Sequence, residues 1–258
     1  MTDELEAIPA LSKRQSVSEV LWEATEPQDT PNGSLVESVY KVLWQQIVEG
    51  ERQQGERFIE LELAGELGVS RTPIRQALFQ LQQAGFVQIG ENRGFHVVIF
   101  GAEDIRELYE LRTILEGAAV RLATASTPEA ALKAGLKEIA LLQQTSEPDL
   151  SPAFLHSDVD FHHQLIVGNC GNRRLREAIA TLRAKMSLFI AGGTRIPGGI
   201  SDALEEHEKV LTAMLSRDSA AAEAAMTRHI ARVQILALDA FATSRPARQR
   251  RFQSLSRA

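Results

Sequence analysis

Four side chains in the second half of the chain have the residue types, and in part the spacing, that a metal site needs. Asp158 and His162 are four residues apart, so on a helix their side chains share one face. His207 and His229 fall in two later helical segments, which an antiparallel bundle can bring toward the same interior. Three imidazoles and one carboxylate suit a divalent transition metal, zinc first, with nickel or manganese as alternatives. From spacing alone the signal for a metal site is weak, because each of these scattered residues could be an ordinary core or surface group.

Arg112 is a further candidate, because it lies among regularly repeating apolar residues in the segment LYELRTILEGAAVRLA. Glu116, one helical turn later, offers it a simple ion pair. The alternative is a bidentate clamp on the carboxylate of a ligand held inside the bundle. The residues themselves are compatible with both roles.

A different chemistry is indicated in the first half, where LGVSRTPIRQALFQLQQAGF predicts a helix starting beside Ser70. Ser70 is a good N-cap, and Pro73 then falls in the first turn, where backbone N–H groups have no intrahelical acceptor. Arg71, Thr72 and Arg75 project from a polar face near the start of this helix. These three side chains are the candidates for reading DNA.

The segment just upstream, Glu60 to Gly68, reads as a short helix closed by a glycine suited to the left-handed conformation. Two helices joined by a tight Gly-Val-Ser turn form a helix-turn-helix, whose second helix enters the DNA major groove. Five arginines could supply the local basic patch that such a reader needs. They are Arg52, Arg57, Arg71, Arg75 and Arg93.

Helix periodicity predicts another helix over residues 35–49, and alternation predicts a two-stranded hairpin over 87–99. Three helices and a hairpin make a winged helix-turn-helix over residues 34–100. Arg93 and Gly94 lie at the turn of the wing, where they could contact the DNA backbone or the minor groove. Residues 1–33 mix charges with proline and glycine and are expected to form a flexible arm.

From residue 101 the strand signals end, and an all-α domain is expected up to residue 243. It contains six predicted helices, over about 103–124, 128–146, 152–169, 172–191, 201–216 and 218–243. The fold class is therefore mainly α, with a winged helix-turn-helix followed by a six-helix bundle. Residues 244–258 form a basic tail, for which a solvated, disordered end is favoured over an auxiliary DNA contact.

Composition narrows the function classes. A net charge of −6 argues against a protein that coats nucleic acid nonspecifically, since lysine and arginine supply most of that affinity. No apolar run of about 18 residues or signal peptide is recognisable, so no membrane partner is expected. The single cysteine, Cys170, fits a reducing cytoplasm and is interpreted as a small buried hydrophobic residue.

Five stretches together resemble the GntR family of transcription regulators, in its FadR subfamily with an FCD effector domain. The N-terminal half contributes ELELAGELGVSRTPIRQALFQLQQAGFV and the wing NRGFHV. The C-terminal half contributes LRTILEGAAVRLA, DVDFHHQLIVGNCGN and EEHEKVLTAMLSRDSAAAEAAMTRHI, in the family's order. Six rather than seven bundle helices resemble the VanR-type branch. Leu61 departs from the pattern, because relatives often place a DNA-contacting arginine there.

The resemblance implies roles for the candidate residues. It implies that Asp158, His162, His207 and His229 are the metal ligands. It also implies that Arg112 faces the effector, with Asn172 lining the same pocket. Members of this kind are homodimers that bind palindromic operators and respond to a small organic acid. The chain is therefore expected to be a ligand-responsive repressor rather than an enzyme.

Two other functions remain compatible with the four-residue cluster. A metal-dependent enzyme could use an open coordination position to polarise water or a carbonyl. The chain contains no H-E-x-x-H glutamate to serve as a general base, which disfavours that reading. A regulator that senses the metal itself is the other alternative, and metal-dependent DNA affinity would identify it.

Overall fold

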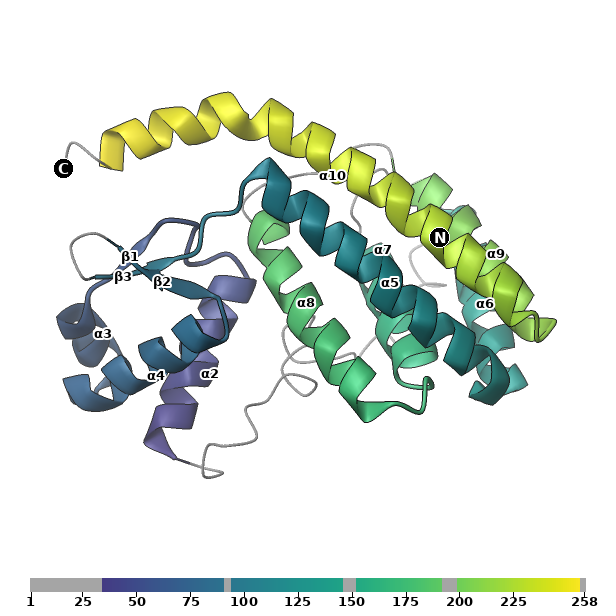
Figure 1. Cartoon of the computed structure of the whole chain (residues 1–258), viewed down its shortest axis with the longest axis horizontal. Coiled ribbons are helices and arrows are strands. Elements are labelled where there is room, and N and C mark those ends of the chain that lie inside the picture. The colour runs from purple at the N-terminus through teal and green to yellow at the C-terminus, as the bar shows by residue number, and fades with distance from the viewer. Residues whose placement is uncertain (1–33, 91–93, 146–151, 192–198, 256–258) are drawn as a thin grey trace.

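The computed structural model describes residues 34–90, 94–145, 152–191 and 199–255. The arm predicted over residues 1–33 and the wing residue Arg93 lie outside this part of the chain. The described residues form two units, a small α/β domain and a helical bundle, joined end to end (Figure 1). The fold class predicted from the sequence is confirmed. No helix in the described ranges is long and apolar enough to cross a membrane.

The N-terminal unit contains three helices and a small sheet. The helices are α2 (Leu35–Val48), α3 (Glu60–Leu67) and α4 (Arg71–Gln83), and the strands are β1 (Arg57–Phe58), β2 (Val87–Ile89) and β3 (Phe95–Val97). The antiparallel sheet has the order β1-β3-β2, so the wing carries a third strand beyond the predicted hairpin. β1 is only two residues long, and such a short strand shows no alternation that sequence analysis could detect.

The predicted helix-turn-helix is confirmed in its main features. Gly68 ends α3 with a φ of 65°, a left-handed conformation that favours glycine. Pro73 lies buried in the first turn of α4. Ser70 occupies the N-cap position, but its side chain makes no capping hydrogen bond, which corrects the predicted capping chemistry. The buried stripe of α4 consists of Pro73, Ile74, Ala77, Leu78 and Leu81.

The C-terminal unit has the six helical segments expected. They are α5 (Ala102–Ser126), α6 (Glu129–Gln143), α7 (Pro152–Val159) continuing into the π-helix η2 (Asp160–Val167), α8 (Arg173–Ala191), α9 (Ile200–Leu215) and α10 (Ser219–Leu255). α10 runs along α5 across one side of the bundle (Figure 1). It continues past the predicted end at residue 243 to Leu255, so residues 244–255 of the tail are helical rather than a disordered end.

The third bundle segment changes its geometry at the candidate metal site. Its α-helical turns end at Val159, and the following turns from Asp160 are π-helical. The backbone N–H of Gly168 accordingly bonds to the carbonyl of His163, five residues back, at 2.6 Å. π-Helical turns are rare and are frequently found at functional sites. Sequence periodicity predicted a helix here without this change of pitch.

The helix α8 belongs to both hydrophobic cores. Ile179, Leu182 and Met186 pack in the bundle core. Ala184 and Leu188 pack instead in the core of the N-terminal unit, beside α2. Adjacent residues of one helix are therefore anchored in different units, and a displacement of α8 would affect both.

Candidate metal centre and DNA-binding face

The three predicted histidine ligands converge in the bundle interior. His162 from η2, His207 from α9 and His229 from α10 are all buried, and one ring nitrogen of each lies within 4.8 Å of the others. The Nε2 atoms of His207 and His229 are 3.3 Å apart. Asp158 completes the group, with Oδ1 3.6 Å from His162 Nε2 and 3.8 Å from His207 Nε2. The structure thus brings together all four residues that the sequence singled out.

Two carboxylates fix the orientation of the imidazole rings. His162 Nδ1 donates a hydrogen bond to Glu116 Oε2 at 2.6 Å, and His229 Nδ1 donates to Glu206 Oε2 at 2.9 Å. Glu206 is itself held by Arg232 through two hydrogen bonds of 2.7 and 2.8 Å. A proton on Nδ1 leaves the Nε2 lone pair as the acceptor, and in His162 this lone pair faces Arg112 Nη2 at 3.2 Å, a contact that a bound metal would replace. Such carboxylate–histidine pairs are typical of metal sites.

Burial keeps the imidazoles of His162 and His207 neutral. It lowers the pKa of His162 to about 4, and it holds the pKa of His207 well below the ordinary histidine value. Burial alone would raise the pKa of Asp158, but His162 and Arg183 hold this pKa well below its usual range. At neutral pH His162 and His207 are therefore neutral and Asp158 is ionised, which are the protonation states that metal binding requires.

Arg112 makes the ion pair that the sequence offered, and it also lies at the histidine group. Its side chain is buried, and Nε donates to Glu116 Oε1 at 2.8 Å, which is the predicted ion pair. Its Nη2 also lies 3.2 Å from His162 Nε2. The guanidinium thus borders the histidine group directly, within reach of an anion that binds there.

Three residues that support this site were not predicted from the sequence. Arg183 of α8 contacts Asp158 Oδ2 at 3.2 Å and Glu116 Oε1 at 3.3 Å. Glu206 and Arg232 hold His229. The run ATLRAKMSLFI contains two cations, Arg183 and Lys185, so residue type did not single out Arg183, and Glu206 carried only its position next to His207.

Asn172 does not reach the site, which corrects its predicted role in the pocket. The residue is exposed, and its Oδ1 accepts the backbone N–H of Leu175 at 3.1 Å, so it caps the start of α8. Arg183 is the α8 residue at the histidine group, and it lies about 16 Å farther along the helix at 1.5 Å per residue. An asparagine at a helix start is well explained by capping alone.

The start of α4 presents the predicted DNA-reading residues. Thr72 is exposed, and the side chains of Arg71 and Arg75 are 59% and 55% exposed. Both arginines bond to the carboxylate of Glu60, at the first position of α3. Leu61, where relatives often have arginine, is 71% exposed on the same helix.

The other basic residues differ in their surroundings. Arg52 bonds to Glu56 at 3.0 Å and to Glu66 at 3.1 Å, so its charge is largely balanced. Arg57 lies against the wing, because a Cβ added at Gly94 would come within 2.8 Å of its Nε. Gly94 therefore leaves room for this guanidinium at the base of the wing.

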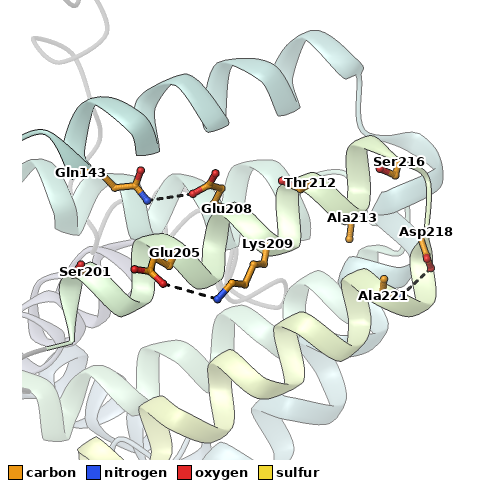
Figure 2. A pocket seen from close by; sticks show the side chains of 10 residues that line it. All are labelled: Gln143, Ser201, Glu205, Glu208, Lys209, Thr212, Ala213, Ser216, Asp218 and Ala221. Atoms are coloured by element: carbon orange, nitrogen blue, oxygen red, sulfur yellow. Dashed lines mark hydrogen bonds and ion pairs between the residues drawn. The ribbon is translucent and has the colours of Figure 1, made fainter.

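A surface groove of about 860 Å³ lies away from the histidine group. It is lined mainly by polar residues of α9 and of the turn that follows it, with Ala221 from the start of α10 and Gln143 from α6 (Figure 2). Figure 2 shows that Gln143 contacts Glu208 and that Glu205 contacts Lys209 across its surface. The α9 residues in it lie on the face opposite His207, so the groove does not lead to the candidate metal centre.

Comparison with known families assigns both units. Residues 35–97 match the family described as bacterial regulatory proteins, gntR family. Residues 107–232 match the FCD domain, and this range contains the whole histidine group. The two matches follow one another along the chain in the order of the two structural units.

Individual relatives agree with this assignment. The Nta operon transcriptional regulator of Aminobacter aminovorans is 37% identical over 132 residues, covering 51% of this chain and 62% of that protein, less than two thirds of its length. The HTH-type transcriptional repressor GlaR of Escherichia coli is 25% identical and covers 74% of this chain and 90% of its own. The structure of E. coli McbR/YncC has the same fold, with a TM-score of 0.59, 22% identity and coverage of 79% and 97% of the two chains.

Proposed function

The chain belongs to the GntR family of bacterial regulatory proteins, and from this premise we propose that it is a ligand-responsive, sequence-specific DNA-binding repressor. Its effector is proposed to be a small organic acid held at a divalent metal in the bundle. The observation that carries the proposal is the convergence of three buried imidazoles and Asp158 in a domain that shares α8 with the helix-turn-helix unit. The relatives named above are regulators, which removes the support for an enzyme.

The proposed DNA contacts come from α4 and the wing. Arg71, Thr72 and Arg75 are exposed at the start of α4, the position from which a recognition helix reaches base edges. Ser70 and Gly94 would add backbone contacts to the phosphates. The remaining predicted contacts are Arg52, Arg57 and Arg93. A homodimer would present two such surfaces to the halves of a palindromic operator.

The donor set fits a divalent transition metal. Asp158, His162, His207 and His229 would hold it, and zinc fits this donor set best, with nickel or manganese as alternatives. A metal held by four protein donors with an open coordination position supplies a binding point for a carboxylate. Arg112 and Arg183 border the group and would neutralise the acid's charge.

Coupling between the two units is proposed to run through α8. Arg183 touches Asp158 at the centre, while Leu188, little more than one turn later, packs in the core of the DNA-binding unit. Gln54 adds a polar link, because its Nε2 donates to the carbonyl of Leu188 at 2.8 Å and its Oε1 accepts the N–H of Phe100 at 3.1 Å. A ligand that redirects Arg183 would therefore shift a helix on which the DNA-binding unit rests.

Binding measurements on the full chain test this proposal. Wild-type protein first selects a duplex from a random-sequence library, and its affinity is then measured at fixed salt with zinc, with acetate, malate or citrate, and with both. We expect selective binding that a carboxylate alters only in zinc-loaded protein. Failure to select any duplex contradicts the function. A response to zinc alone, with no carboxylate effect, identifies a metal sensor instead.

A further inference from the structure

One carboxylate holds both of the arginines proposed to read DNA. Glu60 Oε1 and Oε2 accept hydrogen bonds from Arg75 Nε and Nη2, each at 2.9 Å. Glu60 Oε2 also accepts from Arg71 Nη2 at 3.2 Å. The Glu60 side chain is 15% exposed, whereas both arginines are more than half exposed. A shielded acid on α3 therefore restrains two solvent-facing cations on α4.

The restraint leaves one edge of Arg75 for another partner. A guanidinium has two edges that can make paired hydrogen bonds, one formed by Nε and Nη2 and the other by Nη1 and Nη2. Glu60 occupies the first of these edges. The second edge carries the paired donors that recognise O6 and N7 of guanine in the major groove.

The same carboxylate also reduces the charge available to phosphates. Hydrogen bonding to Arg75 lowers the pKa of Glu60, so the acid is ionised at neutral pH. Its position in the first turn of α3 further favours the negative charge. The triad of Glu60, Arg71 and Arg75 then carries a net charge of one rather than two. Nonspecific affinity depends on such charges, whereas base recognition depends on geometry.

We infer that Glu60 determines the specificity of DNA binding, by orienting Arg75 for a guanine in each half-site and by withholding both arginines from nonspecific phosphate contacts. This inference rests on the proposed DNA-binding function. It assigns Glu60 a positioning role, since the contact with the base is made by Arg75. The recognised chemistry is one guanine per half-site, read on its major-groove edge.

The test compares three variants on the duplex that wild-type protein selects, on the same duplex with each guanine replaced in turn by adenine, and on an unrelated duplex. Glu60→Gln removes the charge and the paired acceptor. Glu60→Asp keeps the charge but shortens the reach. Glu66→Gln is the matched control, because it removes one charge from the same helix while its partner is Arg52.

We expect Glu60→Gln to bind the unrelated duplex more tightly than wild type does. We also expect its preference for guanine over adenine to fall about tenfold at one position per half-site. Glu60→Asp should lose that discrimination while keeping wild-type nonspecific affinity. Glu66→Gln should retain the preference for guanine. Melting curves establish that each variant is folded.

Two outcomes overturn the inference and leave the proposed function intact. In the first, Glu60→Gln keeps the guanine preference within twofold of wild type. In the second, Glu60→Gln and Glu66→Gln change it equally, which would indicate a general charge effect. If wild-type protein selects no duplex, the DNA-binding function itself fails, and the inference fails with it.

Discussion

Arg183 donates a hydrogen bond from Nη2 to Asp158 Oδ2 at 3.2 Å, so a helix anchored in the DNA-binding unit touches a candidate metal ligand directly. The neighbouring residue, Ala184, is fully buried in the core of that unit. Adjacent residues of α8 thus contact the candidate metal centre and the core of the N-terminal unit. This arrangement gives a ligand at the histidine group a short physical path to the helix-turn-helix.

Removing this contact should uncouple the two units. We expect Arg183→Gln to bind the selected duplex within about twofold of wild type, but to lose the response to a carboxylate. Loss of charge-assisted hydrogen bonds should also lower the free energy of unfolding by about 1–3 kcal/mol. Fluorescence anisotropy titrations and chemical denaturation measure the two effects.

Arg174→Gln is the matched control for this variant. Arg174 lies on the same helix, but its side chain is 77% exposed and pairs with Glu177 at the surface. This control should behave like wild type in both measurements. A full carboxylate response in Arg183→Gln would exclude α8 as the path of coupling.

Metal content provides a second test. We expect wild-type protein to retain about one zinc per chain after gel filtration, and His207→Ala to retain none, because the variant loses a central donor. Chelation should destabilise the wild type by about 2.7 kcal/mol relative to protein in metal at 100 times the dissociation constant. His96→Ala serves as the control, since His96 lies on β3 and contacts Gly94. Equal metal content in both variants would rule out the four-ligand site.

Local patterns made much of the fold predictable. The stripe of Ile74, Ala77, Leu78 and Leu81 depends only on helix periodicity, and Gly68 depends only on its freedom to adopt positive φ. Both were found from the sequence. The π-helical turns from Asp160 were not, because nothing in a pattern of apolar residues separates five-residue hydrogen bonding from four.

The residues of the candidate metal centre were predictable only where they belong to a recognisable sequence motif. The four candidate metal donors followed from their residue types and the resemblance to a family. Arg183 and Glu206 were missed because their partners, Asp158 and His229, are more than 20 residues away in sequence and meet them only through bundle packing. Asn172 was assigned to the pocket from the resemblance, whereas its observed partner, the N–H of Leu175, lies only three residues away and gives it a local capping role.

The N-terminal unit should lose stability at alkaline pH through Tyr40. Burial raises the pKa of Tyr40 from 10.0 to about 12, so between these values the unfolded chain releases a proton that the folded protein keeps. The contribution of Tyr40 to the free energy of unfolding is therefore fully present below pH 10. Between pH 10 and about pH 12 it falls by about 1.4 kcal/mol per pH unit, or about 2.7 kcal/mol in all. Denaturation at pH 9 and pH 12 measures this loss. Tyr40→Phe should show a correspondingly shallower decline, and an unchanged slope would show that other groups control it.

The carboxylates behind the histidines should set metal affinity. Glu206 Oε2 accepts the Nδ1 proton of His229 at 2.9 Å, and Glu206→Gln keeps the size of the side chain while weakening this acceptor. We expect zinc affinity to fall about 10- to 100-fold, as for other partners of metal-bound histidines. The adjacent Glu205→Gln is a stringent control, because Glu205 is exposed and contacts only Lys209 among the ion pairs of the described residues. Competition with a zinc-binding dye measures both variants. Equal affinities in the two would mean that Glu206 serves the fold alone, and that the orientation of His229 does not depend on it.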